Sequence, residues 1–199
     1  MASRAVRYST IALGRRPNTP LTGGPTTDEK WGWMPPQSAG LLPYRFNADG
    51  ELEVLVVHPG GPLWAKKDEG VWSIAKGEYA SDEEPQAAAD REFAEELGQP
   101  APLGPRIDLG ELRQPSGKRV HVWAVEGDVD AENVASNMFE LEWPPRSGQR
   151  KYWPEVDRAD WLSLGQAKLK LLKGQIGFVD RLVEHLQHCG GATRCPERD

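Results

Sequence analysis

The stretch GEYASDEEPQAAADREFAEELGQ, residues 77–99, crowds acidic side chains into one short segment of the chain. Pro85 suits the first turn of a helix, where its missing N–H costs nothing, and the alanines that follow have high helix propensity. Gly98 suits the residue that follows a helix. The stretch therefore predicts a helix over about residues 82–97. Acids at spacing i, i+3 and i+4 then share one face of this helix: Glu92, Glu95 and Glu96.

This acidic face needs an explanation, because like charges at helical spacing repel each other. The acids at residues 82–84 suit the positive N-terminal end of the helix dipole. Glu95 and Glu96 lie near the negative end, where they oppose the dipole. One interpretation is a solvated acidic surface. The other is a site for Mg²⁺ or Mn²⁺, which bind oxygen ligands and are usually coordinated by both protein carboxylates and substrate phosphates. The acids near the C-terminal end favour the cation site.

The spacing of the same segment resembles the Nudix box. Five residues separate the first two fixed positions and seven separate the next two, in the order Gly77, Glu83, Arg91-Glu92, the apolar Phe93, Glu95-Glu96 and Gly98. Gln99 stands where this pattern normally has an apolar residue. Upstream, WSIAKG (72–77) is similar to the Trp-x-x-Pro-Lys-Gly of many such boxes, with Ala75 in place of the proline. The resemblance implies a Nudix α/β/α sandwich with a mixed central sheet.

The same resemblance implies a role for each matched position. It implies these ligands for divalent cations: the Gly77 carbonyl, Glu92, Glu95 and Glu96. Arg91 would orient the carboxylates, Glu83 would support the box through Arg91, and Gly98 would end the helix. The general base differs between members of the family, so two candidates stay open: Glu92, and Glu155 in the later segment WPEVD.

Basic and aromatic residues outside the box are candidates for substrate contacts. GGPLWAKKDEG (60–70) predicts a loop with two adjacent lysines, and RSGQRK (146–151) predicts a second basic loop flanked by aromatic residues. Cations beside aromatic rings suit a nucleotide, through phosphate pairing and base stacking. Solvated loop side chains are the alternative interpretation. The candidate contacts are Lys66, Lys67, Lys76, Arg146 and Tyr152.

The rest of the chain predicts strands and a second helix around the box. The predicted strands are AGLLPYRF (39–46), LEVLVVH (52–58), GVWSIAKG (70–77), IDLGELR (107–113), RVHVWAVEG (119–127) and VDRADWLSL (156–164). The turn NADG (47–50) predicts a hairpin. Apolar residues at helical spacing predict a helix over residues 174–187. His121 is expected on the less buried face of its strand and not as a metal ligand.

The length of 199 residues suits one catalytic domain, expected at residues 37–187. Residues 1–36 show no sustained period and are expected to be a disordered or expression-derived extension. Residues 188–199 are expected to be a flexible tail. A zinc cluster is a weaker interpretation of this region, because the spacing fits no standard site: His185, His188, Cys189 and Cys195.

The charge and hydropathy of the chain limit its partners. A formal net charge of −6 argues against long nucleic acid as a main partner, while a small nucleotide substrate remains compatible. The sequence has neither a long apolar run nor a secretory signal, so we expect no membrane partner and a cytoplasmic location. The oligomeric state stays open, and a dimer is compatible with the sequence.

Motifs beyond the box extend the resemblance over residues 37–186. The segments HPGGPLWAKK, EWPPRSGQRKYWPEVDRADW and KLLKGQIGFVDRL resemble one bacterial branch of predicted nucleoside triphosphate pyrophosphohydrolases. The expected function is divalent-metal-dependent cleavage of a phosphoanhydride bond in a nucleoside diphosphate derivative, with a nucleoside triphosphate or a dinucleoside polyphosphate as substrate. The alternative is a Nudix-fold nucleotide-binding or regulatory module without turnover. Such modules usually lose box acids, so the intact box favours the enzyme.

Overall fold

The computed structural model describes residues 37–190, with side chains described as far as His188. The extension expected at residues 1–36 and most of the tail expected at residues 188–199 lie outside the described residues. In chain order the elements are β1 (Gln37–Phe46), β2 (Leu52–Pro59), β3 (Ala75–Glu78), α1 (Pro85–Leu97), β4 (Ile107–Arg113), β5 (Arg119–Glu126), β6 (Met138–Glu142), β7 (Arg150–Pro154), β8 (Val156–Ser163), α2 (Leu164–Lys170), the 3-10 helix Lys173–Gln175 and α3 (Ile176–Gly190).

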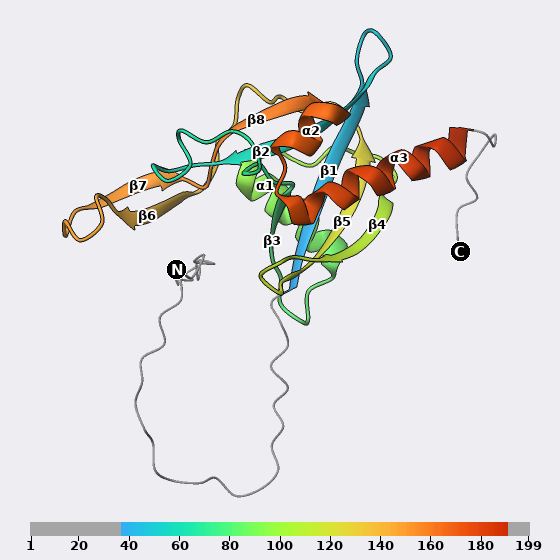
Figure 1. The fold of residues 1–199 in the computed structure, drawn as a ribbon. Helices are drawn as coiled ribbons and strands as arrows, with labels where there is room; N and C mark the ends of the chain where they lie inside the picture. The colour runs from blue at the N-terminus through green and yellow to red at the C-terminus, as the bar shows by residue number, and fades with distance from the viewer. Residues whose placement is uncertain (1–36, 191–199) are drawn as a thin grey trace, which may run out of the picture. The chain divides into compact units, whose positions relative to one another are not determined.

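A six-stranded mixed sheet forms the centre of the described domain, in the order β4-β5-β1-β2-β8, with β3 also paired to β1 (Figure 1). Strand β1 runs parallel to β5 and antiparallel to β2 and β3. It also changes neighbour along its length, because residues 38–41 pair with β3 and residues 44–46 pair with β2. Strand β3 therefore brings the start of the box beside the first half of β1, where helix α1 also packs.

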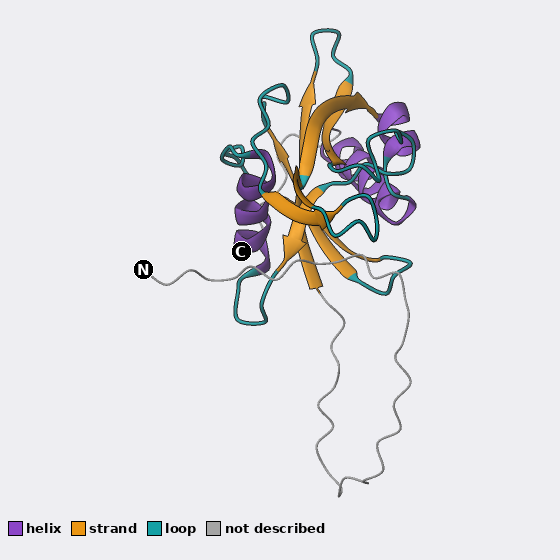
Figure 2. Cartoon of the chain, turned by 90° about the vertical axis from the view of Figure 1, so that its left-hand side faces the viewer, coloured by secondary structure: helices purple, strands orange, loops and turns teal. Residues whose placement is uncertain are grey.

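Alternation along the central strands builds one core on each face of the sheet. In β1, Ala39 and Leu41 pack with Phe93 of α1, while Leu42 and Tyr44 pack with Phe178 of α3 on the opposite face. Figure 2 shows the consequence, with helix on both sides of the sheet. The chain thus has an α/β fold with a mixed central sheet and helices on both faces, as the sequence predicts.

Helix α1 begins later than the sequence predicts, at Pro85 instead of residue 82. Glu84 is its N-cap, with extended backbone and a carboxylate that accepts a hydrogen bond from the N–H of Ala87 at 2.7 Å. A residue before proline is kept out of the helical region, so the helix cannot extend further upstream. At the other end Gly98 has φ 73° and its N–H donates to Ala94, which closes the helix in the left-handed conformation.

The segment between β5 and β8 holds a hairpin where the sequence predicts a basic loop. Residues 150–154 are a strand, β7, which pairs with β6 in a separate two-stranded sheet. Only residues 143–149 form the connection, so the predicted loop at residues 146–151 is too long at its end. Gly61 seats this hairpin, because a Cβ there would lie 3.2 Å from the ring of Phe139.

Three further differences concern the C-terminal part and β3. Strand β3 is confined to Ala75–Glu78, so the strand predicted over residues 70–77 is present only in its last three residues, with isolated bridges at Trp72 and Ser73 before it. The sequence does not predict helix α2, and α3 continues to Gly190, three residues beyond the end of the helix predicted over residues 174–187. Among residues 37–190, no helix is long and apolar enough to cross a membrane.

Candidate active site

Arg91 joins the carboxylates of the box into one network on helix α1. Its guanidinium donates to Glu83 through Nε at 2.8 Å and through Nη2 at 3.1 Å. The Nη1 atom donates to Glu92 at 2.7 Å and to Glu95 at 3.4 Å. The hydrogen bond to Glu83 is the main cause that raises the pKa of Arg91, and Arg91 in turn lowers the pKa of the Glu83 carboxyl. The positive charge of the Arg91 guanidinium offsets the repulsion among these carboxylates.

Gly77 lies directly beneath the Glu92 carboxylate. A Cβ at residue 77 would overlap the carboxylate oxygens of Glu92, so only glycine fits here while Glu92 keeps this position. This close approach places the backbone of β3 next to the acidic face of α1. Burial is the main cause that raises the pKa of Glu92, and Arg91 opposes that shift.

Glu96 is half-buried on α1, beside the backbone of β3. Its carboxylate accepts a hydrogen bond from the backbone N–H of Lys76 at 3.2 Å. Burial raises its pKa to about 8, against the opposing effect of Lys76, and the charges of Glu92 and Glu155 add to the rise. Burial also lowers the pKa of the Lys76 side chain. A carboxyl group with a raised pKa beside an amine with a lowered pKa indicates a site of low dielectric constant in which charges lie close together.

Glu155 is distant from the box in the sequence and lies directly before β8. Its backbone is fixed on both sides: its N–H donates to Asn137 at 2.8 Å, and its carbonyl accepts from Gly60 at 2.9 Å. Burial raises the pKa of Glu155, and the charges of Glu92 and Glu95 raise it further. The fold therefore brings Glu155 into the electrostatic neighbourhood of the box acids.

The residues present fit a divalent cation in kind. Carboxylates and a backbone carbonyl are the oxygen ligands that Mg²⁺ and Mn²⁺ prefer, and the glycine at residue 77 leaves Glu92 room beside β3. In this structure the carboxylates instead contact Arg91 and the Lys76 N–H. Within residues 37–190, no three or more His, Cys, Asp or Glu side chains stand in the arrangement of a ready metal site.

The predicted substrate contacts lie on separate segments around the box. Lys66 and Lys67 are exposed on the loop at residues 60–70, and the ammonium of Lys67 lies 4.7 Å from the centre of the Trp64 ring. Arg146 lies in the connection between β6 and β7 with φ 65°, and Tyr152 is 67% exposed on β7. The Cβ of Lys76 lies against Gly40 in β1. Lys76 contacts the box through its N–H, which donates to Glu96, whereas the other four candidates lie on the loop at residues 60–70 and on the hairpin.

Two other predicted residues have clear positions. His121 is half-buried in β5, stacked on Trp123 at 4.1 Å between ring centres and 2.6 Å from Asp108, so it lies on a strand as predicted. His188 lies on α3, while Cys195 lies outside the described residues. Lys118, which no sequence motif indicates, donates to Glu78 at 3.0 Å in β3. Its turn, QPSGK, carries no signal for this contact.

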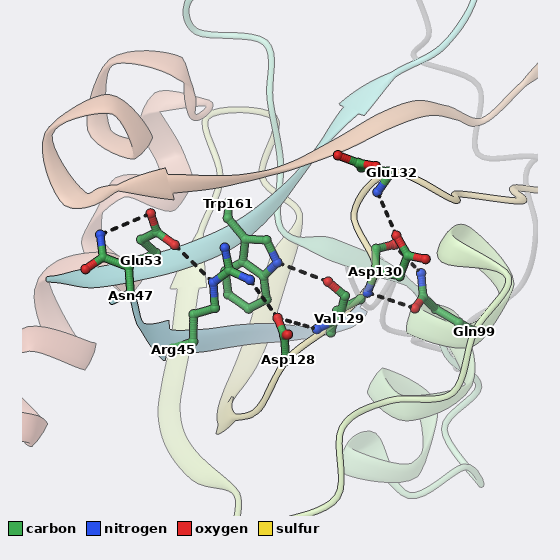
Figure 3. Close-up of polar contacts among 9 residues, drawn as sticks. All are labelled: Arg45, Asn47, Glu53, Gln99, Asp128, Val129, Asp130, Glu132 and Trp161. Atoms are coloured by element: carbon green, nitrogen blue, oxygen red, sulfur yellow. Dashed lines mark hydrogen bonds and ion pairs between the residues drawn. The ribbon is translucent and has the colours of Figure 1, made fainter. Parts of the chain in front are cut away.

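A surface pocket of about 580 Å³ lies on another part of the domain. The Arg45 guanidinium stacks at 4.3 Å on Trp161 and pairs with Glu53 and Asp128 (Figure 3). Asp130 accepts hydrogen bonds from the residues after it and exchanges bonds with Gln99. None of the predicted site residues lines this pocket, and three of its polar lining residues, Arg45, Asp128 and Asp130, are engaged in the contacts just described.

A family model for the NUDIX domain matches residues 34–182 of the chain. The chain belongs to the NUDIX family. The matched region contains the box, Glu155 and both cores, so the family assignment covers the whole candidate site. No curated protein matches the chain in a direct sequence comparison.

Solved NUDIX structures share the fold at low sequence identity. The NUDIX domain of Shewanella oneidensis NrtR, complexed with ADP ribose, superposes with a TM-score of 0.55 and 16% identity, over 80% of this chain and 94% of that one. The Caenorhabditis elegans Ap4A hydrolase, in a binary complex, gives 0.52 and 19%, over 77% and 98%. The Mycobacterium smegmatis Nudix hydrolase RenU gives 0.51 and 23%, over 81% and 92%. These similarities establish the fold.

Proposed function

We propose that this NUDIX protein is a divalent-metal-dependent pyrophosphohydrolase that cleaves a phosphoanhydride bond in a nucleoside diphosphate derivative. The observation that carries the proposal is the complete set of box acids: Glu92 and Glu96 lie against the backbone of Gly77 and Lys76, and Glu95 joins them through Arg91. A fold that needed only stability has no reason to bury Glu96 beside other carboxylates, since burial of a like-charged cluster costs free energy.

The box residues and the Gly77 carbonyl are proposed to hold Mg²⁺ or Mn²⁺. Such a cation neutralises phosphoryl charge and acidifies a water molecule, which are the main requirements for attack on a phosphoanhydride. Arg91, fixed by Glu83, keeps the carboxylates in one orientation. A carboxylate with a raised pKa is a better proton acceptor, and both Glu92 and Glu155 have this property.

We assign the basic loops to substrate binding. Lys66 and Lys67 on the loop at residues 60–70 would meet phosphate oxygens, and Lys76 would add a cation beside the box. Arg146 and Tyr152, on the hairpin that packs against Gly61, would contact the distal part of the substrate. Exposed cations on loops beside an acidic metal centre are an arrangement that suits a polyphosphate.

A nucleoside triphosphate or a dinucleoside polyphosphate is the proposed substrate. Two proteins of the same fold support a nucleotide ligand, since one is complexed with ADP ribose and another is an Ap4A hydrolase. ADP ribose is a nucleoside diphosphate linked to a further group. The shared element of these ligands is a nucleoside diphosphate, which is the part that the box would engage.

A nucleotide-binding module without turnover is the second candidate function. It is favoured only by the contacts of Glu92 and Glu95 with Arg91, which occupy the carboxylates in this structure. Both pairs are partly exposed, and exposed ion pairs are weak, so a cation can displace them. The enzyme therefore remains the better-supported proposal.

The test is product release from nucleoside triphosphates, dinucleoside polyphosphates and nucleotide sugars, with Mg²⁺, Mn²⁺ or chelator. Wild type is compared with Glu96→Gln and with Glu51→Gln, an exposed turn acid far from the box in sequence. The proposal expects metal-dependent turnover in wild type and Glu51→Gln, and none in Glu96→Gln. Nucleotide binding without turnover on the whole panel would support the binding module instead.

A further inference from the structure

A fully buried histidine, His58, lies at the end of β2 and is not part of the box. Its Nε2 atom lies 2.9 Å from the carbonyl oxygen of Lys67, and its Nδ1 atom lies 2.7 Å from Oδ1 of Asp157. A carbonyl oxygen can only accept a hydrogen bond, so Nε2 is the donor of that pair. The ring also packs edge-on against Trp72, with centroids 5.1 Å apart. One buried side chain thus contacts two segments that are distant in the sequence.

The two segments that His58 contacts are those that carry the proposed phosphate lysines and the candidate base. Lys67 is on the loop at residues 60–70, next to Lys66. Asp157 follows Glu155 by two positions. A backbone hydrogen bond also joins these two segments, because the N–H of Gly60 donates to the carbonyl of Glu155. A Cβ at Gly60 would overlap the carbonyl oxygen of Pro154, so this approach requires glycine.

A β-bulge explains why Asp157 reaches His58. In the β2–β8 pair, His58 is opposite Arg158 but Pro59 is opposite Val156, which leaves Asp157 as the extra residue. A bulge of this kind re-aims the side chain of the extra residue and interrupts the ladder. The strand pairing is therefore interrupted beside Glu155, and the hydrogen bond of His58 supplies a link there.

A second set of contacts holds the loop at residues 60–70, through Asp68. Asp68 accepts a hydrogen bond from Nε1 of Trp72 at 2.9 Å and pairs with Lys170 at 3.3 Å. Arg158 lies 4.0 Å from Asp68 and 3.9 Å from Asp157, so its guanidinium is shared by both sides. The groups around His58 therefore include the charged side chains of β8, α2 and the loop itself.

We propose that His58 is a positioning residue: it fixes the lysine loop relative to Glu155 and so aligns substrate phosphate with the proton acceptor. This proposal rests on the proposed function of the site. The Nε2 contact holds the loop and governs substrate binding, and the Nδ1 contact holds the Glu155 segment and governs the chemical step. Loss of the first contact raises KM, and loss of the second lowers kcat.

Two conservative variants separate the contacts. In His58→Gln the side-chain amide reaches the place of Nε2 and retains the donor to Lys67, whereas in His58→Asn it reaches the place of Nδ1 and retains the contact to Asp157. Asp157→Ala removes the second contact from the exposed side without altering a buried position. We expect a KM rise of about tenfold in His58→Asn, and a kcat loss of about tenfold in His58→Gln and Asp157→Ala.

A readout that needs no activity tests the same proposal. The carbonyl that His58 holds belongs to the Lys67–Asp68 peptide bond, which is a trypsin site next to Lys66. Limited trypsin digestion of the native full-length protein, followed by mass spectrometry, should show about tenfold faster cleavage after Lys66 or Lys67 in His58→Asn than in wild type or His58→Gln. Chemical denaturation of each variant provides the measure of global stability.

The outcomes distinguish the positioning role from a packing role and from failure of the proposed function. A KM and kcat split between the variants, with selective loop cleavage in His58→Asn, supports the proposal. Equal changes in every readout that follow the loss of global stability, or wild-type behaviour of all three variants, would overturn it. If wild type turns over nothing on the substrate panel, the proposed function fails, while the trypsin comparison still decides whether His58 holds the loop.

Discussion

The guanidinium of Arg91 and the carboxylate of Glu83 are joined by two hydrogen bonds, of 2.8 and 3.1 Å. This pair links the loop before helix α1 to the helix itself, and the remaining nitrogen of Arg91 reaches Glu92 at 2.7 Å. The orientation of a candidate metal ligand thus depends on a residue nine positions earlier in the chain. The relationship predicts that a change at Glu83 alters catalysis without contact to substrate.

We expect Glu83→Gln to lower kcat/KM by about ten- to a hundredfold, because Arg91 loses its fixed position and misplaces Glu92. The free energy of unfolding should fall by only about 1 kcal/mol, since the pair is partly exposed. Steady-state kinetics and urea denaturation measure the two effects. Glu84→Gln is the matched control, because a glutamine oxygen can still accept the N-cap hydrogen bond. Equal kinetics in Glu83→Gln and Glu84→Gln would show that Glu83 does not position Glu92 through Arg91.

Gly77→Ala should abolish most activity by steric conflict. A Cβ at residue 77 overlaps the Glu92 carboxylate, so that side chain must leave its position. We predict a loss of about a hundredfold or more in kcat/KM, with the fold retained by circular dichroism. Gly165→Ala is the control, because a Cβ there meets nothing within 4 Å. A fully active Gly77→Ala variant would contradict the proposed place of Glu92.

The metal-free protein should lose stability as the pH rises. Glu96 has a folded-state pKa of about 8 against an ordinary value of 4.5, so folding favours its neutral form. Its stabilising contribution is complete below about pH 4.5 and disappears as the pH passes through about 8. The expected difference is on the order of 2 kcal/mol, smaller than the full shift implies because the site retains some solvent.

Denaturation of wild type and Glu96→Gln in chelator, from pH 5 to 8.5, measures this effect. The variant should be as stable as wild type at pH 5 and more stable at pH 8, because glutamine carries no charge. Added Mg²⁺ should reduce the difference by stabilising the ionised wild-type site. Parallel pH curves for the two proteins would show that Glu96 ionises freely in the folded state.

The general base is expected to be Glu155. Glu92 contacts Arg91, which opposes the rise in its pKa, whereas burial and the like charges of Glu92 and Glu95 all raise the pKa of Glu155. Glu155→Gln should therefore lower kcat by about 10²- to 10⁴-fold and flatten the acid limb of the pH–rate profile. Glu92→Gln should instead weaken Mg²⁺ activation. If Glu155→Gln keeps its acid limb and loses little kcat, Glu92 is the base.

The sequence predicts those parts of the fold in which local pattern and burial agree. Apolar residues indicate the positions of β1, β2, β4, β5 and β8, because β1, β2, β5 and β8 contribute to both cores and β4 contributes to one. The box helix was predicted with its end at Leu97 but with a start that ignored the effect of Pro85 on the preceding residue. Local sequence patterns thus predict the approximate position of an element better than they predict the residue at which it begins.

Elements that bury little were missed. The hairpin of β6 and β7 has exposed residues along much of both strands, so its residues read as a polar loop. Its position depends on contacts with Gly60 and Gly61, which are distant in sequence. His58 was also missed, although its signal was present: it is a single polar residue at the end of an apolar strand. Its partners, Lys67 and Asp157, are joined to it only by the tertiary fold.

The most direct test of the central claim is turnover as a function of Mg²⁺ concentration, measured for wild type and Glu96→Gln on the most active class of the substrate panel. The account predicts that wild type releases a nucleoside phosphate and the remaining phosphorylated fragment, that chelator stops the reaction, and that Glu96→Gln is inactive at all Mg²⁺ concentrations. Turnover that persists in chelator, or a fully active Glu96→Gln variant, would contradict it.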